Sequence, residues 1–475
     1  MMEAVRNWGI LVGGEWHDDP DRIEVRNAFD NERVGTVVRG TEEMVFAAIS
    51  AAETASLQAF PAHERYDVLM EAAALIDAAA DEYADTIARE GSKTISEARH
   101  EPPRAATIIR LAAGESRRIA GETLPFDIRP GSENRKGYYT RRPVGVVAAI
   151  MPFNDPMAVT AHKIGPAIAA GNSVVVKPDS STPLSILRMA EDFMTAGLPP
   201  GRLNVVTGHG SEIGDAIVRD PRVRLVAFTG GVATGRQITK TAGIKKLLLE
   251  LGANSPVIVM PDADLENACS AIIAGAFAQA GQNCLGVQRI FIHNEIYESF
   301  SNMLVEATGR LKAGHSMDES VDVCQMIRLR DAERVDEWVN EAVAEGASIL
   351  SGGSREGAVY EPTLLENIPA GAKLECDEIY GPVASLFEFE DLFEAVDRAN
   401  AVDFGLHAAI FTESLRDAFY AVENLNVGAV IVNDSTDYRL DSMPFGGFRS
   451  SGVGREGIRF AVEAMTETRV ACFNL

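Results

Sequence analysis

The chain has 475 residues, of which 46% are hydrophobic and 24% are charged, and its formal net charge is −25. This composition is typical of a globular protein rather than a disordered one, and the length is sufficient for more than one domain. The strong negative charge argues against a nucleic acid partner, because binding to phosphates needs surfaces rich in Lys and Arg.

The cysteines and the N-terminal segment indicate a cytoplasmic protein. The five cysteines show no CxxC spacing, which argues against a disulfide framework or a zinc site and favours a reducing compartment. The segment MMEAVRNWGILVGGEW has an early Glu and lacks the long apolar region of a signal peptide. No apolar stretch approaches the ~20 residues of a membrane helix. We therefore expect a cytoplasmic protein with no metal site and no membrane association.

Two kinds of pattern follow one another along the chain. The first hundred residues are expected to be mostly helical, because MVFAAISAAETASLQAF and ERYDVLMEAAALIDAAADEYADTIARE carry apolar residues at a spacing of about 3.6. The segment ETLPFDIRPGSENRKGYYTRRPVG combines a Pro130-Gly131 turn with short extended runs and predicts a hairpin. From Val144 onward, apolar runs alternate with helical segments, as in βαβ units of a parallel sheet. A second such series begins near Asn254, so two α/β domains are expected, with a boundary at 251–254.

The motif GQNC, residues 281–284, is the sharpest chemical signal. Gly281 permits a tight turn, so that the thiol of Cys284 can be presented beside a close approach of the backbone. Taken alone, a single cysteine among apolar neighbours is more simply interpreted as a small core residue. Three further segments change this balance.

These segments place polar side chains at the ends of expected strands. LELGANSP puts Glu250 at a strand end, where a carboxylate near a thiol can act as a general base. IMPFNDP puts Asn154 just before a helix, where its amide can donate to an oxyanion. CDEIYGPV puts Glu378 and Tyr380 before a Gly-Pro turn. The structural alternatives are an exposed carboxylate, an Asx turn and a plain loop, respectively.

These four motifs, together with VVKPDSSTPLS around Lys177 and FTGGVATG around Gly230, resemble the aldehyde dehydrogenase superfamily. The resemblance covers almost the whole chain, up to the closing MTETRV. It implies an α/β fold with a Rossmann-like dinucleotide-binding domain, an α/β catalytic domain and a β-hairpin oligomerisation element.

The resemblance also implies where these parts lie and how the chain assembles. The expected ranges are 1–121 and 143–251 for the NAD(P)-binding domain, 252–455 for the catalytic domain, and 122–142 and 456–475 for the oligomerisation element. The strand-like tail RVACFNL would leave an unpaired edge, and such edges are often covered by another subunit. A homodimer or a homotetramer is therefore implied.

The catalytic residues implied by the resemblance are Cys284, Glu250, Asn154 and Lys177. Cys284 would attack the aldehyde and carry the acyl group as a thioester. Asn154 and the Cys284 backbone N–H would stabilise the oxyanion, and Glu250 would activate the water that hydrolyses the thioester. Such covalent capture divides one difficult step into two easier ones, each with its own helper.

The residues implied in cofactor binding are Lys177, Ser180, Gly230, Gly235, Glu378 and Tyr380. Lys177 would reach the adenosine ribose, Gly230 and Gly235 would let the backbone approach the pyrophosphate near a helix N-terminus, and Glu378 would hold the nicotinamide ribose. Gly231 stands where many members have Ser, so one phosphate hydrogen bond is missing. Ser180 stands where strictly NAD-dependent members often carry Glu. NAD is expected as the cofactor, and without that carboxylate NADP is not repelled.

Two segments resemble the lactaldehyde, non-phosphorylating glyceraldehyde-3-phosphate and phosphonoaldehyde branch: FNDPMAVTAHKIGPAIAAGN and NDSTDYRLDSMPFGGFRSSGVGREG. In that branch, residues at the positions of Arg104, His162 and Arg439 help to bind a polar or anionic substrate tail. Asn283 departs from the pattern, since some anion-specific members have Arg immediately before the catalytic cysteine.

Local spacing gives separate support for Arg104. Together with Ile108 and Leu111 it falls at positions i, i+4 and i+7 of an expected helix, on its apolar stripe. A charged side chain there needs a partner or a ligand. A structural ion pair for Arg104 and a structural role for His162 remain open alternatives.

We therefore expect oxidation of a small, polar or anionic aldehyde to its acid. A CoA-acylating dehydrogenase is the nearest alternative, but such enzymes tend to lack the carboxylate that Glu250 supplies. A thiol protease would need a partner His segment, which we do not find. A non-enzymatic binding protein on the same fold would be expected to have lost Cys284 or Glu250.

Overall fold

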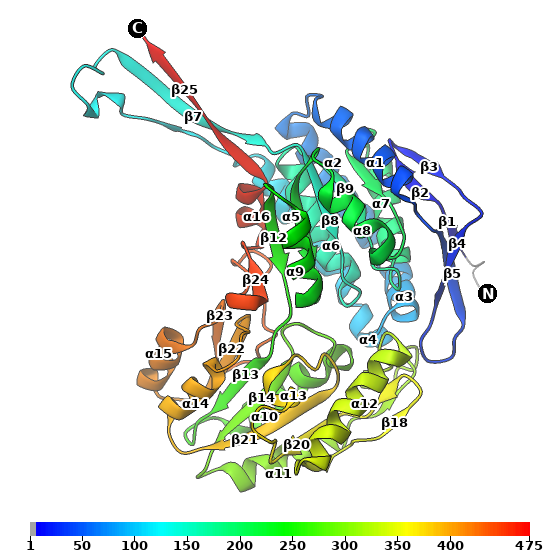
Figure 1. Cartoon of the computed structure of the whole chain (residues 1–475), viewed down its shortest axis with the longest axis vertical. Helices are drawn as coiled ribbons and strands as arrows, with labels where there is room; N and C mark the ends of the chain where they lie inside the picture. The colour runs from blue at the N-terminus through cyan, green and yellow to red at the C-terminus, as the bar shows by residue number, and fades with distance from the viewer. Residues whose placement is uncertain (1–5) are drawn as a thin grey trace.

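The computed structural model describes residues 6–475, in which two large sheets with helices on their faces carry a smaller, projecting sheet (Figure 1). The first large sheet has eight strands in the order β24-β12-β11-β8-β9-β10-β2-β3. They are β2 (Ile10–Val12), β3 (Glu15–His17), β8 (Val146–Ile150), β9 (Ser173–Lys177), β10 (Leu203–Val205), β11 (Val223–Thr229), β12 (Lys246–Glu250) and β24 (Gly452–Val453). Strands β8 to β12 are parallel, whereas β2, β3 and β24 pair antiparallel at the two edges.

Helices bury both faces of this sheet. One face is covered by α1 (Glu42–Ser56), α8 (Gly210–Arg219) and α9 (Val232–Thr241). The other is covered by α2 (Ala62–Ala78), α5 (Glu101–Ser116), α6 (Pro156–Ala169) and α7 (Leu184–Thr195), with α3 (Ala80–Glu90) and α4 (Ile95–Ala98) at its end. Val146 and Ala148 of β8 point into one core, and Val147 and Ala149 point into the other. This double burial explains why the strands are continuous apolar runs.

The second large sheet has seven strands in the order β17-β20-β21-β14-β13-β22-β23. They are β13 (Ser255–Val259), β14 (Val287–His293), β17 (Ser348–Ser351), β20 (Thr363–Glu366), β21 (Val383–Phe389), β22 (His407–Phe411) and β23 (Ala429–Val432). All pairs are parallel except β17 with β20. Its helices are α10 (Leu265–Phe277), α11 (Tyr297–Thr308), α12 (Leu329–Ala344), α14 (Leu392–Asn400) and α15 (Leu415–Asn424). The predicted α/β fold with parallel sheets is confirmed.

The chain crosses from the first sheet to the second between β12 and β13, at residues 251–254. It later returns, because β24 pairs with β12, and α16 (Ile458–Ala464) packs on α5 and α6. Residues 452–464 therefore lie with the first sheet, whereas the sequence-based ranges 252–455 and 456–475 assign them elsewhere.

The N-terminal residues differ from the expected helical pattern. Residues 6–38 form strands, and a three-stranded sheet contains β1 (Arg6–Trp8), β4 (Arg22–Arg26) and β5 (Arg33–Val38). The prediction that the first hundred residues are mostly helical was wrong for this part, because it rested on the Ala-rich segments that follow. Here the longest strand, β5, is rich in β-branched residues, and Val25, Val37 and Val38 are buried.

A separate three-stranded sheet projects from the part of the molecule built on the first large sheet, as Figure 1 shows. It pairs β6 (Glu122–Thr123) and β25 (Thr466–Asn474) with the two sides of β7 (Arg135–Pro143). The pairing of β25 with β7 is antiparallel and runs from Thr466 opposite Pro143 to Asn474 opposite Arg135. The tail is thereby joined to the predicted hairpin.

Short elements complete the described residues: η1 (Phe126–Ile128), η2 (Ala278–Gly281), β15 (Ala313–Gly314), β16 (Val323–Cys324), β18 (Arg355–Glu356), β19 (Val359–Tyr360), α13 (Lys373–Cys376) and η3 (Arg449–Ser451). Within residues 6–475, no helix combines the length and apolar character needed to cross a membrane. The same residues contain no cluster of three or more His, Cys, Asp or Glu side chains suited to a metal ion.

Candidate active site

The sequence-predicted residues gather at the ends of parallel strands. Glu250 ends β12, Lys177 ends β9, and Asn154 follows β8 just before α6. Cys284 lies between η2 and β14, in the segment that enters the second sheet. Carboxyl ends of parallel strands meet at one edge of a sheet, where ligands usually bind.

The segment before Cys284 is an unusual turn. Gln279, Ala280 and Gly281 all have left-handed backbone angles, with φ of 55°, 53° and 67°. A Cβ at Gly281 would overlap the carbonyl group of Gly381, so only glycine fits there. Left-handed non-glycine residues each cost about 1–3 kcal/mol and persist only where the surroundings hold them. Here the Gln279 N–H donates to the Glu97 carboxylate at 2.8 Å.

The Cys284 side chain is half-buried and packs against an apolar group that includes Ala253, Leu285 and Phe445. Burial raises the pKa of its thiol to about 12, and the negative charges of Glu378 and Asp155 act in the same direction. The positive charge of Arg439 opposes them. The neutral thiol is therefore the favoured form at neutral pH in this arrangement.

Glu250 is buried, and within the described chain neither of its carboxylate oxygens has a hydrogen-bond partner. Burial raises its pKa well above the usual value, and the charge of Glu456 raises it further, while Lys163 and Arg439 lower it. A buried carboxylate without partners has free acceptor capacity for a water molecule, and its raised pKa makes it a stronger base than an exposed one.

Lys163 and Glu456 form an ion pair that the sequence analysis missed. The Lys163 ammonium donates to Glu456 at 2.6 Å and to the Thr229 hydroxyl at 2.7 Å. Arg439 donates to the other Glu456 oxygen at 3.2 Å, which leaves this carboxylate with a pKa lowered to about 2 despite its burial. The signal in the sequence was a lysine inside α6, a helix in which every residue is buried.

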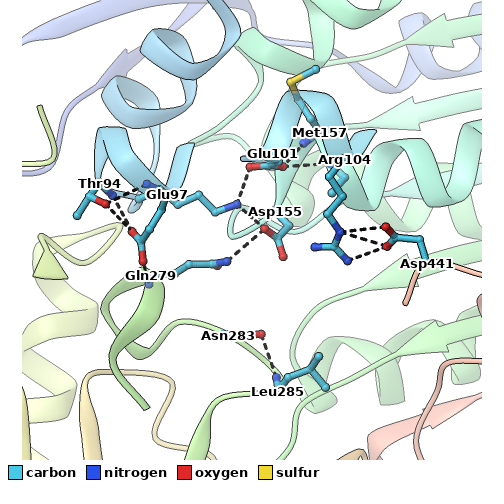
Figure 2. A network of polar contacts seen from close by, with 12 residues as sticks. Thr94, Glu97, Glu101, Arg104, Asp155, Met157, Gln279, Asn283, Leu285 and Asp441 are labelled. Atoms are coloured by element: carbon cyan, nitrogen blue, oxygen red, sulfur yellow. Dashed lines mark hydrogen bonds and ion pairs between the residues drawn. The ribbon is translucent and has the colours of Figure 1, made fainter. Parts of the chain in front are cut away.

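Asn154 is held at the start of α6. Asp155 occupies the N-cap position but its side chain does not cap the helix. Instead, Glu101 accepts the Met157 and Ala158 N–H groups at 2.8 and 3.0 Å, as Figure 2 shows for Met157. A carboxylate from another helix thus fixes the turn that carries Asn154.

The cofactor residues lie around two neighbouring features. Lys177 is buried, and burial together with the nearby Arg328 charge lowers its pKa. Next to it, a cavity of about 490 Å³ is lined by Ser180, His209, Arg328, Leu329, Arg330 and Glu333. The second feature is the N-terminus of α9, where Gly231 is the N-cap residue and provides no side-chain cap.

The two glycines expected near the pyrophosphate are also closely packed against protein atoms. A Cβ at Gly235 would lie 2.6 Å from the Leu251 side chain, and a Cβ at Gly230 would lie 2.5 Å from the Phe228 ring. Their lack of a side chain therefore accommodates protein atoms, and this packing provides a reason for glycine independent of any cofactor. A Cβ at Gly231 would meet nothing within 4 Å.

Glu378 and Tyr380 lie beside Cys284. Glu378 accepts the Ala253 N–H at 2.8 Å, and burial raises its pKa to about 7. Its carboxylate occupies the space that a Cβ at Gly252 would need. Tyr380 has a left-handed backbone with φ of 46° and stacks edge-on against Phe153, with ring centroids 5.9 Å apart.

The three candidate substrate residues are all bound to carboxylates. Arg104 donates to Asp441 through Nε at 3.1 Å and Nη2 at 2.9 Å, and His162 Nε2 lies 3.0 Å from the same carboxylate. Arg439 pairs with Glu456. Burial and the Arg439 charge lower the His162 pKa to about 4, so this imidazole is neutral at neutral pH.

The predicted apolar stripe around Arg104 is only partly correct. Ile108 is fully buried, but Leu111 is 37% exposed, and the Arg104 side chain is 34% exposed. α5 is buried along its whole length, through residues such as Ala105, Ile109 and Ala112, and Leu111 lies outside that buried face. Of the two apolar residues predicted to share a buried stripe with Arg104, only Ile108 is therefore buried.

Comparison with known proteins places these features in a family. Residues 16–471 match the aldehyde dehydrogenase family. A 3-sulfolactaldehyde dehydrogenase from Priestia megaterium is 45% identical over 474 residues, covering 100% of this chain and 99% of the relative. A lactaldehyde dehydrogenase from Methanococcus aeolicus is 37% identical, covering 98% and 100%.

Solved structures of similar proteins support the same family assignment. An aldehyde dehydrogenase from Physcomitrella patens, in complex with the reaction product succinate, has a TM-score of 0.96 at 36% identity and 99% coverage of both chains. An NADP-dependent glyceraldehyde-3-phosphate dehydrogenase from Bacillus halodurans, complexed with NADP, has a TM-score of 0.96 at 35% identity, covering 99% of this chain and 100% of the other. The predictions of an oxidoreductase acting on aldehydes and of NAD(P) as its cofactor are confirmed. The chain belongs to the aldehyde dehydrogenase family.

Proposed function

We propose that this enzyme oxidises a short aldehyde with a polar or anionic tail to the carboxylic acid, through a thioester on Cys284. The observation that carries the proposal is the placement of one half-buried thiol beside Glu250 and Glu378, with charged side chains beyond it. A reacting carbon bound to this sulfur lies next to a carboxylate that can activate water.

The roles of the side chains follow from chemistry. The Cys284 thiol loses its proton to solvent, and the thiolate attacks the aldehyde carbon, which forms a C–S bond and an oxyanion that the Asn154 amide and the Cys284 N–H stabilise. The aldehyde hydrogen then leaves with its electron pair as a hydride, for which NAD(P) would be the acceptor, and the oxyanion collapses to a thioester. Glu250 takes a proton from water, the water oxygen attacks the thioester carbon, and the C–S bond breaks to release the acid and the Cys284 thiolate.

The residues fit NAD(P). Lys177 and Ser180 would hold the adenosine ribose beside the cavity, the open N-terminus of α9 would bind the pyrophosphate, and Glu378 would hold the nicotinamide ribose. When bound, the nicotinamide ring supplies the hydride acceptor. Arg330 and Ser180 on the cavity wall favour acceptance of the additional 2′-phosphate of NADP, whereas Glu333 on the same wall opposes it and Arg328 is paired with Asp179.

Ser180→Glu is expected to lower kcat/KM with NADP by about fivefold or more, because like charges a few ångströms apart cost on the order of 1–4 kcal/mol. Activity with NAD should change little. The measurement is steady-state formation of reduced cofactor with each nucleotide, and Ser180→Gln, which adds bulk without charge, should retain NADP use. Equal losses with both cofactors would show that residue 180 does not face the ribose.

The tail of the substrate is proposed to bind near Arg104 and Arg439. Both guanidinium groups are held in fixed positions by carboxylates, and Arg104 keeps part of its surface accessible. The substrates named for relatives, 3-sulfolactaldehyde and lactaldehyde, are short aldehydes with polar tails. The Asp441 partner of Arg104 makes this region less cationic than the arginines alone suggest.

The enzyme is expected to prefer 3-sulfolactaldehyde, lactaldehyde or succinic semialdehyde over propionaldehyde. Arg104→Ala should lower kcat/KM for the charged aldehydes by about ten- to a hundredfold, since one charge-assisted hydrogen bond is worth about 1.5–3 kcal/mol. Reduced-cofactor absorbance and identification of the acid product measure both, with and without added CoA. An acyl-CoA product would instead support the acylating alternative.

Arg110→Ala is the matched control for this prediction. Arg110 lies on the same helix and pairs with Asp77 on the surface, so its loss should leave the selectivity between aldehydes unchanged. If Arg104→Ala lowers activity equally for charged and uncharged aldehydes, Arg104 only supports the fold.

We also propose that the chain forms a homodimer or homotetramer through the projecting sheet and resides in the cytoplasm. The strands β7 and β25 expose Tyr138, Val470 and Phe473, and apolar side chains on a free sheet favour contact with another subunit. All five cysteines are free thiols, as is usual in a reducing compartment.

A further inference from the structure

A buried lysine connects the two turns of the site. Lys93 lies between α3 and α4 with only 4% of its surface exposed. Its ammonium donates to Glu101 at 2.5 Å and also to Asp155. A buried ammonium with two carboxylates is a structural ion triad. It fixes the positions of its carboxylates and so of the backbone segments that they contact.

Those carboxylates hold the segments on either side of the reacting groups. Glu101 anchors the first turn of α6, directly after Asn154. Asp155 accepts a hydrogen bond from the Gln279 side-chain amide at 3.3 Å, across to the left-handed turn that leads to Cys284. Through Asp155, Lys93 therefore connects the turn that carries Asn154 with the turn that carries Gln279.

The charge of Asp155 also acts on the thiol. The charged groups that influence Cys284 are Glu378, Asp155 and Glu250, which disfavour the thiolate, and Arg439, which favours it. Among the positive charges near Asp155, that of Lys93 lowers the Asp155 pKa the most.

Other charges around Asp155 are held by different partners. Arg104 and Arg439 also act on it, but Arg104 is bound to Asp441 and Arg439 to Glu456. Glu101 is the second carboxylate of the lysine. Lys93 is therefore the only one of these cations whose ammonium or guanidinium bonds directly to Asp155 among residues 6–475.

We propose that Lys93 is a positioning residue that, through Asp155, locks the Asn154 turn against the Gln279 turn and neutralises the carboxylate bonded to the turn that leads to Cys284. The proposal rests on the proposed function in one respect, that Cys284 is the reacting thiol. Without Lys93, the Asp155 charge is opposed only by Arg104 and Arg439, which bond to other carboxylates, so more of it acts on the sulfur.

The test measures the thiolate directly. Full-length enzyme is alkylated with iodoacetamide from mildly acidic to alkaline pH, and modification of the Cys284 peptide is followed by mass spectrometry. Lys93→Met should slow alkylation at neutral pH by about tenfold and move the pH profile upward by about one unit, because the less compensated charge of Asp155 disfavours the thiolate and one pKa unit is a tenfold change in thiolate fraction. Lys93→Met/Asp155→Asn should restore the wild-type profile.

Two further variants separate charge from folding. Lys245→Met also removes a partly buried lysine, one that donates to the backbone oxygens of Val218 and Asp220, and should leave the Cys284 profile unchanged. Asp155→Asn alone keeps the Lys93–Glu101 pair and should accelerate alkylation at neutral pH.

An unchanged profile in Lys93→Met, or no restoration in the double variant, overturns the proposal. If Lys93→Met does not fold, a failure of Asp155→Asn to accelerate alkylation overturns it. Because alkylation needs no turnover, these results do not depend on whether Cys284 is the nucleophile, which the alanine variant of that residue tests by itself.

Discussion

Cys284→Ala is expected to abolish the formation of reduced cofactor, with kcat falling by at least about a thousandfold. Without the sulfur no thioester can form, and removal of a nucleophile from an enzyme that works by covalent catalysis typically leaves only a small residual rate. The variant should fold, because the side chain is half-buried and contacts a small apolar group. Steady-state absorbance measures turnover, and calorimetric titration with NAD measures the retained cofactor binding.

The other cysteines provide the controls. Cys269 and Cys324 are buried, and Cys376 and Cys472 are exposed. Their alanine variants should keep kcat near the wild-type value, with a lower midpoint of thermal unfolding for the two buried ones. Near-normal turnover in Cys284→Ala, or loss of chemistry in any one of the four controls, would contradict the assignment.

The parts of the fold that were predictable from the sequence are those determined by local pattern. The strands that end at Lys177 and Glu250 were recognisable because residues buried on both faces form continuous apolar runs. The strands of residues 6–38 were not, although some are as long, because charged and polar residues interrupt their apolar runs and much of their surface is exposed.

The residues of the candidate site also fall into those that a local motif marks and those that it does not. Cys284, Glu250 and Asn154 stand beside turn residues at strand ends, so motifs mark them. Lys93 and Glu456 carry no such mark, since their partners are far away in the sequence: Lys93 meets Asp155, and Glu456 meets Lys163. Long-range pairing follows from the packing of the helices, and spacing along the chain does not reveal it.

Substrate recognition was the least predictable part, for a physical reason. The sequence marks Arg104 and His162 as candidates for binding a polar or anionic substrate tail, but their charge depends on what neutralises them. Asp441 binds both, and burial lowers the pKa of His162 to about 4. Binding of an anion by a protonated His162 therefore does not fit its surroundings at neutral pH.

Glu250→Gln is expected to stop the reaction after its first half. The amide has the same shape as the carboxylate but cannot take a proton from water, so the thioester on Cys284 should form and then hydrolyse slowly. A rapid burst of reduced cofactor, about one equivalent per active site, should precede a steady rate that is lower by about a hundred- to ten-thousandfold. Rapid mixing measures the burst, and the mass of the intact protein should increase by that of the acyl group.

The pH dependence gives this prediction a second measurement. A general base works only when ionised, and burial together with Glu456 raises the pKa of Glu250, while Lys163 and Arg439 oppose the shift. The wild-type deacylation rate should therefore rise as the pH increases through this raised pKa and become constant above it. In Glu250→Gln the rise should be absent from the slow phase. A variant that binds cofactor but gives no burst would show that Glu250 acts before the thioester forms, by helping to deprotonate the Cys284 thiol, whose own pKa burial raises to about 12.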